Sequence, residues 1–579
     1  MTYRSMGRAI SILLLLVVYT PFHLEAGKAP MYPMRFLNTE EILDYCLELE
    51  ALTLNSSLSS FSYRSAGSPG AEASADWIAD KMRSFGLEVR FENFSFLSWE
   101  LYDKPSLILY VDSQPIRLDT FVPLHMSWPT PMEGLRGNIT IYKWGEAAVQ
   151  VSGSILVVGV DELILNRGVE EFFECVELNE PKAVIYTYTN IVNMWMPPIL
   201  NSAEGMEFWD IGAPAGWIEY SDWMKIKEAL KRGEAQAEIR VPAAIGSDLH
   251  RNVVGELPRV ESDGIIILSA HYDTVVSPGF IDDASGVAGV LAIAHAFAEA
   301  NKRRYTPPYK MKFIFFTAEE LGLIGSIQYR MRHRAELSRI IGVINLDSIG
   351  GLRLKITEST SLLDEIAAEA ARELGVPLAA ETSVRLRQTP CTNSEPASEL
   401  LNLRESQSYK TGADHLTFED PEAALQIAEK RWGSLQLPID ENISIPAVTI
   451  TSRPIFPYYL RTGEEPGWIH TPYDNSTTPG WIAGERLKSH VEATALTVLK
   501  AFQISSGDGD LSLHILDHFI RENQASILGA TTSGEMLEAE LKRSGQATTT
   551  TQTILPALIL IVIGATIILL PKKRVIRRH

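Results

Sequence analysis

The sequence predicts an α/β protein with helices on both faces of a sheet and a β-rich insertion, and three observations lead to this. The 579 residues are 45% hydrophobic and 21% charged, as in globular proteins with a large core. From residue 252 onward, apolar strand-like runs alternate with helix-like runs, which is typical of an α/β sheet. Between about residues 108 and 245, strands and turns follow one another with one late helix.

Charge and cysteine content narrow the classes of function. The formal net charge is −20, which argues against nucleic-acid binding because phosphate contacts need a basic face. The three cysteines, Cys46, Cys175 and Cys391, are far apart and show no C-x-x-C spacing. A zinc site made of cysteines is therefore not expected, and at most one disulfide can form within the chain.

Residues 1–26 have the pattern of a signal peptide. Arg4 and Arg8 precede the apolar run AISILLLLVVY, and Leu24-Glu25-Ala26 resembles a cleavage site. The run is short for a membrane span, and a retained anchor is the alternative.

The folded body begins near residue 36. The spacing of apolar residues predicts a helix over Thr39–Leu54 and a second amphipathic helix through Trp77 that ends at Gly86. The turn-rich loop YRSAGSPG separates the two helices. Alternation then predicts a strand over Leu87–Phe96. We take residues 27–107 as the first part of the catalytic domain.

Residues 108–245 are expected to form an inserted domain. The apolar runs Ser154–Val160 and Lys182–Tyr186 predict buried strands, and Ser221–Arg232 predicts a helix. Histidines and carboxylates do not gather in this stretch of the sequence. We therefore expect it to have a structural role or to control substrate access.

Residues 246–503 are expected to complete the catalytic domain. Strands are predicted at Gly264–Ser269, Met311–Thr317, Ile340–Leu346 and Pro446–Ile450. Helices are predicted at Ser285–Asn301, Leu321–Arg332, Ser361–Leu374 and Arg486–Phe502.

The C-terminal region predicts a membrane anchor. Residues 504–552 are expected to form a stalk, and residues 553–571 contain an apolar run long enough for a transmembrane helix. The tail 572–579 is basic, and basic residues stay on the cytoplasmic side of a membrane. We expect a single-pass protein of the cell membrane with its catalytic body outside the cytoplasm and its C-terminus inside.

Potential metal ligands lie in a fixed order along the chain, each after a predicted strand or within a turn-rich loop. His271 and Asp273 come first, then Asp282-Asp283, Glu319-Glu320, Asp347, Asp414-His415 and His470. Each could be an ordinary helix cap or surface residue when taken singly. Together they gather imidazole and carboxylate groups at strand ends, where α/β proteins build their sites, and these groups are zinc ligands.

The motifs HYDT, DDASG, AEELGLIGS, NLDSIG and WIHTPYD resemble, in this order, those of the co-catalytic two-zinc aminopeptidase family of the MH clan. That family includes bacterial leucine-type aminopeptidases and glutamate carboxypeptidases. The resemblance covers about residues 36–107 and 246–503 and implies a mixed, mostly parallel sheet flanked by helices. Residues 108–245 resemble more loosely a protease-associated domain, through SGSILVVG, EPKAVIYT and GAPAGWIEYSDWMKIKEAL.

The resemblance implies a role for each candidate residue. Asp282 would bridge two zinc ions, although other divalent metals can occupy such sites. His271, Glu320, Asp347 and His470 would be the other ligands, with His271 and Asp347 on different ions. Glu319 would be the general base, and Asp273 would orient His271 by accepting its other ring N–H. The family also implies a cis peptide bond between Asp282 and Asp283.

The leading function is a membrane-anchored extracytoplasmic zinc exopeptidase that releases N-terminal residues from peptides. Carboxypeptidase action or glutaminyl cyclisation on the same fold is the first alternative, although cyclases of this fold use one zinc. A receptor-like relative that has lost the metals is the second, and the filled ligand positions speak against it. A serine hydrolase is disfavoured because no G-x-S-x-G motif occurs. The preferred terminal residue and the oligomeric state stay open.

Overall fold

The computed structural model contains two sheets within the compact unit that ends at Ser505. It describes residues 32–54, 63–143, 151–160, 162–163, 169–187, 189, 212–233, 235–275, 277–357, 363–379, 413–432, 435, 443–452, 469–470, 472–477 and 484–505.

The first sheet has seven strands in the order β1-β10-β12-β11-β13-β15-β14. Its four central strands, β12, β11, β13 and β15, run parallel to one another, and the pairs β1–β10, β10–β12 and β14–β15 are antiparallel. The expectation of a mixed sheet is confirmed. The strand bounds are β1 Glu88–Leu101, β10 Ala243–Glu256, β11 Ile265–His271, β12 Lys310–Phe316, β13 Ile340–Asp347, β14 Lys355–Ile356 and β15 Ala447–Thr451.

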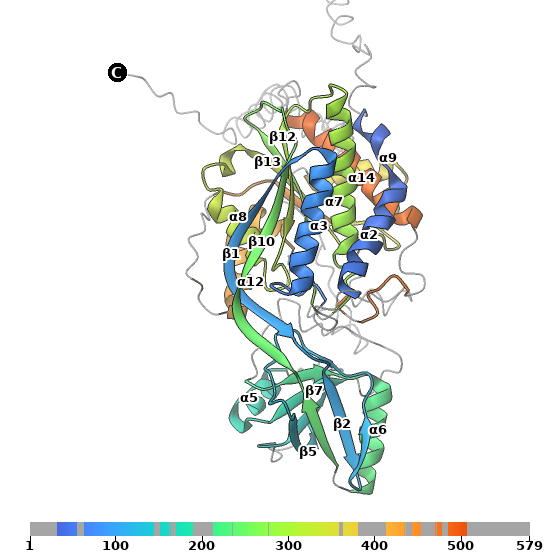
Figure 1. The fold of residues 1–579 in the computed structure, drawn as a ribbon, viewed down its shortest axis with the longest axis vertical. Coiled ribbons are helices and arrows are strands. Elements are labelled where there is room, and N and C mark those ends of the chain that lie inside the picture. The colour runs from blue at the N-terminus through green and yellow to red at the C-terminus, as the bar shows by residue number, and fades with distance from the viewer. Residues whose placement is uncertain are drawn as a thin grey trace, which may run out of the picture. The chain divides into compact units, whose positions relative to one another are not determined.

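Helices cover both faces of this sheet. Ile266 and Leu268 of β11 pack in one apolar cluster with helices α2, α3, α7, α9 and α14, whereas Ile265 and Ile267 pack in another with Tyr329 of α8. Figure 1 shows α2 and α7 on one side of the strands and α8 on the other. Neighbouring strand residues point to opposite faces, so a strand buried on both faces reads as a continuous apolar run. The bounds are α2 Thr39–Leu54, α3 Pro69–Phe85, α7 Ala284–Lys302, α8 Ile324–Arg332, α9 Leu363–Glu373, α11 Leu416–Glu419, α12 Pro421–Trp432 and α14 Gly484–Ser505, with short 3-10 turns at Pro33–Phe36 and Leu337–Arg339.

Most predicted elements of this part of the chain are confirmed, with small shifts at their ends. Helix α3 starts after the cap Ser68, whose hydroxyl accepts from Ala71 N, and stops at Gly86 with φ 95°. Only glycine adopts such a φ at little cost, which explains why the helix ends there. Helix α8 begins three residues later than predicted, because residues 321–323 form a turn.

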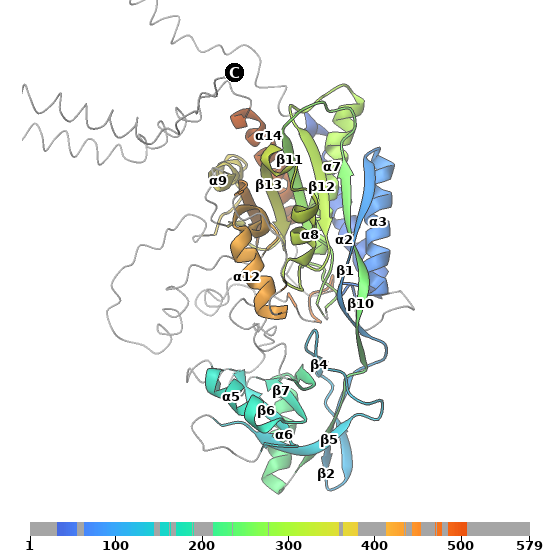
Figure 2. The ribbon, with the colours of Figure 1, turned by 90° about the vertical axis from the view of Figure 1, so that its left-hand side faces the viewer.

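Strand β10 is the longest element of this sheet that the sequence pattern misses; helix α12 and the short strand β14 were not predicted either. It pairs antiparallel with β1 over fourteen residue pairs, from Glu88 with Glu256 to Leu101 with Ala243. Figures 1 and 2 show the two strands side by side along their length. The first half of β10 is mostly exposed and includes Gly246 and Asp248, so it lacks the apolar signal of a buried strand.

The second sheet has eight strands in the order β3-β2-β9-β5-β6-β7-β8-β4. The chain enters it after β1, and Tyr102 N donates to Pro242 O next to the first pairs of β2 with β9. The expected boundaries at 107/108 and 245/246 thus fall inside strands β2 and β10. The bounds are β2 Ser106–Val111, β3 Gln114–Arg117, β4 Val122–Pro123, β5 Leu135–Ile141, β6 Ile155–Gly159, β7 Ala183–Thr187, β8 Ala215–Trp217 and β9 Gln236–Arg240, with helices α5 Val169–Asn179 and α6 Tyr220–Arg232.

Several expectations fall outside the described residues. These are the signal peptide 1–26, residues 506–552 of the expected stalk, the membrane span 553–571 and the basic tail 572–579. Among the helices that the structure describes, none is long and apolar enough to cross a membrane. Cys46 and Cys175 are free thiols, and Cys391 lies outside the described residues.

A buried histidine on α14 predicts that acid weakens the fold. His490 Nδ1 accepts from Gly350 N at 3.0 Å, and burial, aided by the charge of Arg486, lowers its pKa to about 4. Because an unfolded histidine titrates near 6.5, the stabilisation is complete above that pH and is lost as the pH falls towards 4. We expect His490 to account for up to ~3 kcal/mol of the loss in unfolding free energy.

The measurement is urea unfolding of the metal-free protein at pH 7.5, 5.5 and 4.5, compared with His490→Gln. Glutamine can accept from Gly350 N and carries no proton-dependent charge. The variant should therefore lose less stability than the wild type on acidification. Equal losses in the two proteins would contradict the assignment.

Candidate metal centre

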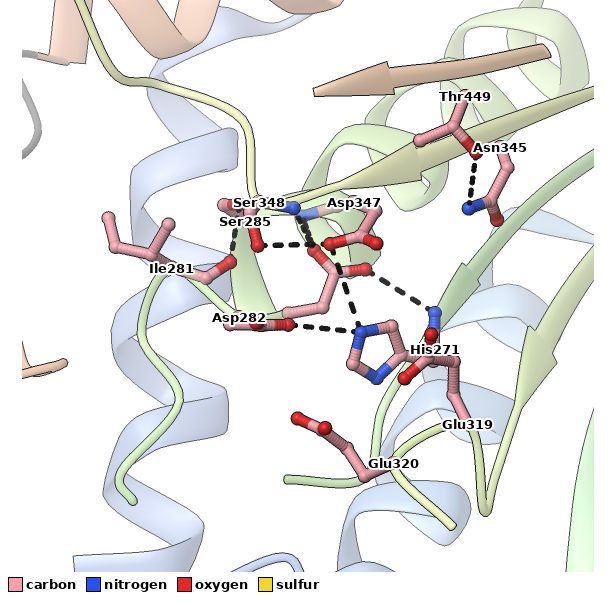
Figure 3. Close-up of polar contacts among 12 residues, drawn as sticks. His271, Ile281, Asp282, Ser285, Glu319, Glu320, Asn345, Asp347, Ser348 and Thr449 are labelled. Atoms are coloured by element: carbon pink, nitrogen blue, oxygen red, sulfur yellow. Dashed lines mark hydrogen bonds and ion pairs between the residues drawn. The ribbon is translucent and has the colours of Figure 1, made fainter. Parts of the chain in front are cut away.

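The carboxyl ends of three parallel strands bring the candidate ligands together. His271 is the last residue of β11 and Asp347 the last of β13, and Glu319-Glu320 follow β12. Parallel strands end at the same edge of a sheet, so side chains far apart in the sequence meet there. Figure 3 shows His271, Asp282 and Asp347 directed toward one another, with Glu320 facing them.

Five of the candidate residues form two groups that share Asp282. His271, Asp282 and Asp347 make one group, and Asp282, Glu320 and His470 make the other. Within each group, one potential ligand atom per residue lies within 4.8 Å of the others. His271 and Asp347 are thus together, which corrects the expectation that they belong to different ions.

Asp282 faces both groups with different oxygen atoms. Its Oδ1 lies 3.0 Å from His271 Nε2, and its Oδ2 lies 3.2 Å from His470 Nε2. His470 Nε2 is also 3.1 Å from Glu320 Oε1, and His271 Nε2 is 4.0 Å from Asp347 Oδ1. A carboxylate placed in this way can give one oxygen to each of two metal ions.

Two neighbouring carboxylates hold the loop that carries Asp282. The Asp282–Asp283 peptide bond is cis, as expected. Asp283 accepts from His271 N at 3.3 Å and from Gly286 N and Ser348 N at 2.9 Å each. Asp474 accepts from Ile281 N at 2.7 Å and Asp282 N at 3.2 Å. These backbone bonds fix Asp282 relative to the strand ends.

Asp273 holds the Glu319-Glu320 turn and also lies beside the His271 ring. Its two carboxylate oxygens accept from Glu319 N at 3.1 Å and Glu320 N at 3.2 Å. His271 Nδ1 lies 3.1 Å from the Asp273 carbonyl oxygen and 3.7 Å from its carboxylate. The main-chain oxygen is the closer partner of the ring, and the orienting role of the Asp273 side chain stays a prediction.

Burial and crowding of like charges shift the protonation of the site. Burial raises the pKa of Glu319 well above its ordinary value, and the neighbouring carboxylates add to this. For His470, burial acts to lower the pKa, but the carboxylates of Glu320 and Asp282 overcome it and raise the pKa to about 10. An acid cluster that holds protons this strongly favours a bound cation, which would displace them.

Three buried charged residues near the site were missed as functional candidates or had no assigned role. Burial raises the pKa of Asp414 to about 7 and that of Asp474 to about 8. The Arg64 guanidinium donates to the carbonyl oxygens of Tyr272, Pro278 and Gly279 at 2.7–2.8 Å. Asp474 and Arg64 lie in the quoted motifs WIHTPYD and YRSAGSPG, but the motifs do not say which backbone groups they bind.

The donor set fits two zinc ions. Two imidazoles and three carboxylates are typical ligands of catalytic zinc, which keeps an open position. Ala318 and Ser348, just after β12 and β13, and the candidate ligand His470 have φ values of 57°, 57° and 59°. Left-handed backbone at such residues is uncommon and clusters at functional sites.

Comparison with known proteins agrees with this geometry. Residues 252–495 match the family described as peptidase family M28. Aminopeptidase YwaD of Bacillus subtilis is 24% identical over 484 residues, which is 81% of this chain and 88% of that protein. A probable leucine aminopeptidase 2 of Aspergillus oryzae is 31% identical over 134 residues, 23% of this chain and 26% of that protein.

A solved structure shares the fold. BSAP, a zinc aminopeptidase from Bacillus subtilis, aligns with a TM-score of 0.52 and 20% sequence identity over 80% of this chain and 95% of that chain. The chain spans about a quarter of the length of the fungal leucine aminopeptidases that it matches. It spans about half the length of a probable lipoprotein aminopeptidase of Mycobacterium tuberculosis.

Proposed function

We propose that this chain, whose residues 252–495 match peptidase family M28, is a two-zinc aminopeptidase that removes N-terminal residues from peptides. The observation that carries the proposal is the pair of ligand groups that share Asp282. His271 and Asp347 would hold one ion with Asp282, and Glu320 and His470 the other. Zinc at these positions would supply Lewis acidity and acidify a nearby water.

Glu319 is the base in this proposal. It lies in neither ligand group, but it comes three residues after the end of β12 and next to the ligand Glu320. Its carboxylate takes a proton from the attacking water while the new C–O bond forms at the scissile carbonyl. It then gives that proton to the leaving amine nitrogen as the C–N bond breaks. The Asp273 carboxylate accepts a hydrogen bond from the backbone N–H of Glu319 and so positions this residue.

The choice between aminopeptidase and carboxypeptidase is tested with free and N-acetylated peptides. We expect the zinc-loaded full-length protein to release single N-terminal residues from free peptides only, because the amino group must lie at the metal pair. A chelator should abolish the reaction, and mass spectrometry of the products reads the outcome. Trimming of acetylated peptides from the C-terminus would assign carboxypeptidase activity instead, and N-terminal ring closure without cleavage would assign cyclase activity.

We further propose that the protein is anchored in the cell membrane by residues 553–571, with the catalytic body outside the cytoplasm, and that residues 108–245 form a protease-associated-like insertion. The apolar run and the basic tail that follows it support the anchor. Protease added to intact cells should degrade the body and spare the C-terminal tail. A catalytic body that is protected from protease in intact cells would show that the proposed orientation is wrong.

A further inference from the structure

A cavity of about 210 Å³ lies where loops of the first sheet meet the second sheet. Tyr63 and Pro472 line it from the side of the metal centre, and Lys104, Arg117 and Phe121 line it from the side of the second sheet. Pockets for drug-sized ligands usually measure roughly 300–1,000 Å³. This cavity is smaller, so it suits one residue of a peptide rather than a whole ligand.

The two loops that carry Tyr63 and Pro472 connect the cavity to the metal centre. Pro472 follows the candidate ligand His470 by two residues, and Asp474 in the same loop accepts from Asp282 N. Tyr63 precedes Arg64, whose guanidinium donates to the Tyr272 carbonyl just after His271. A substrate bound at the metal pair would therefore have this cavity beside it.

A direct hydrogen bond ties the two walls together. The Tyr473 hydroxyl donates to Glu219 Oε1 at 2.6 Å, and Glu219 is the residue before helix α6 of the second sheet. The loop that carries Pro472 is therefore hydrogen-bonded to the part of the chain that forms the second sheet.

The charges in the cavity favour an anion. Among the described residues, no side chain forms a hydrogen bond or ion pair with the Lys104 ammonium. Its neighbour Asp103 is bound by Arg240 at 2.6 Å, which lowers the pKa of that carboxyl. Arg117 Nε lies 3.5 Å from Asp119 Oδ1, and both side chains are more than half exposed. Two cations against one carboxylate make a positive cavity on a chain of net charge −20.

We propose that this cavity binds a carboxylate of the peptide substrate on the C-terminal side of the scissile bond, with Lys104 and Arg117 as its partners. The inference rests on the proposed aminopeptidase activity, because an N-terminal residue at the metal pair leaves only later residues for a neighbouring cavity. Apolar side chains such as Leu118 and Phe121 line the remainder and suit the body of that residue. The carboxylate is either the C-terminus of a short peptide or an acidic side chain.

Paired substrates test this with the full-length enzyme. Leu-Gly-Gly is compared with its C-terminal amide, and Leu-Glu-Gly amide with Leu-Gln-Gly amide, so that the two carboxylate sources are separated. We expect kcat/KM to favour at least one carboxylate form by about fivefold, the upper range of an exposed ion pair. The double variant Lys104→Gln/Arg117→Gln should abolish that preference through KM, and salt should weaken it in the wild type.

The control is Lys231→Gln. Lys231 is an exposed cation on helix α6 and does not line the cavity, so this variant should retain the wild-type preference for the carboxylate. Hydrolysis of Leu-Gly-Gly amide and Leu-Gln-Gly amide, which carry no carboxylate, by the double variant at the wild-type rate would show that the metal centre is intact. If the wild type hydrolyses no peptide, the proposed function fails. If it hydrolyses them without a carboxylate preference, or if the double variant keeps that preference, the cavity assignment is wrong.

Discussion

Replacing Glu319 by glutamine is expected to lower kcat by roughly 10²–10⁴-fold, the usual contribution of a general base. Zinc content should stay at the wild-type level, because Glu319 belongs to neither ligand group. Glutamine preserves the length of the side chain, and the backbone bond from residue 319 to Asp273 does not depend on the side chain. The variant therefore removes the proton acceptor and little else.

The measurement pairs kcat on a free peptide with zinc determined by atomic spectroscopy on the same sample. Glu320→Gln is the matched control, since it makes the same chemical change one residue along. Because Glu320 Oε1 lies 3.1 Å from His470 Nε2 in the second ligand group, this control should lose zinc as well as activity. A Glu319→Gln enzyme with kcat within tenfold of the wild type would remove Glu319 from the role of base.

Replacing Asp282 by alanine is expected to remove both zinc ions and all measurable activity. Its two oxygens face His271 and His470 separately, so the loss of one side chain takes a ligand from both groups. No single replacement of His271, Asp347, Glu320 or His470 should do this, because each of them belongs to one group only. Zinc per chain after dialysis against a weak chelator is the measurement.

The variant Asp474→Asn is the comparison for Asp282→Ala. Asp474 is expected to position Asp282 without binding a metal ion itself. Asp474 touches the backbone N–H groups of Ile281 and Asp282, and asparagine keeps one carbonyl oxygen for them. Its zinc affinity should fall by about 10–100-fold, as for other residues that orient metal ligands. Asp282→Ala protein that keeps both ions, or an Asp474→Asn protein that loses both under the same dialysis, would contradict the assigned roles.

The ligand residues could be found from the sequence because their signal is local. His271 and Asp347 end apolar runs that are recognisable as buried strands, and Glu319-Glu320 follow a third. Parallel strands with helices on both faces end at one edge, so the order of motifs was enough to bring these residues together. Strand β10 lacked such a signal, since its pairing with β1 involves many exposed and polar residues.

The roles of the supporting residues depended on contacts that no sequence spacing expresses. Asp273 was expected to orient the ring of His271, two residues away, and the structure adds that its carboxylate accepts from two amides of a turn nearly fifty positions later. Asp474 reaches the backbone of Asp282 across 192 positions. The grouping of His271 with Asp347 likewise follows from the register of β11 beside β13.

By itself, the sequence of this protein determined the helices and strands with strong apolar periodicity and the set of histidines and carboxylates from which the resemblance to the two-zinc aminopeptidase family selects the five candidate ligands and the candidate base. Those properties are set by side-chain chemistry and by spacing along the chain, both of which can be read locally. Only the tertiary structure decided which ligands share a group, which carboxylates bind backbone amides, and that Lys104 and Arg117 line one cavity together with Tyr63 and Pro472. These are distances between segments that only folding brings together, and they depend on strand register and loop conformation.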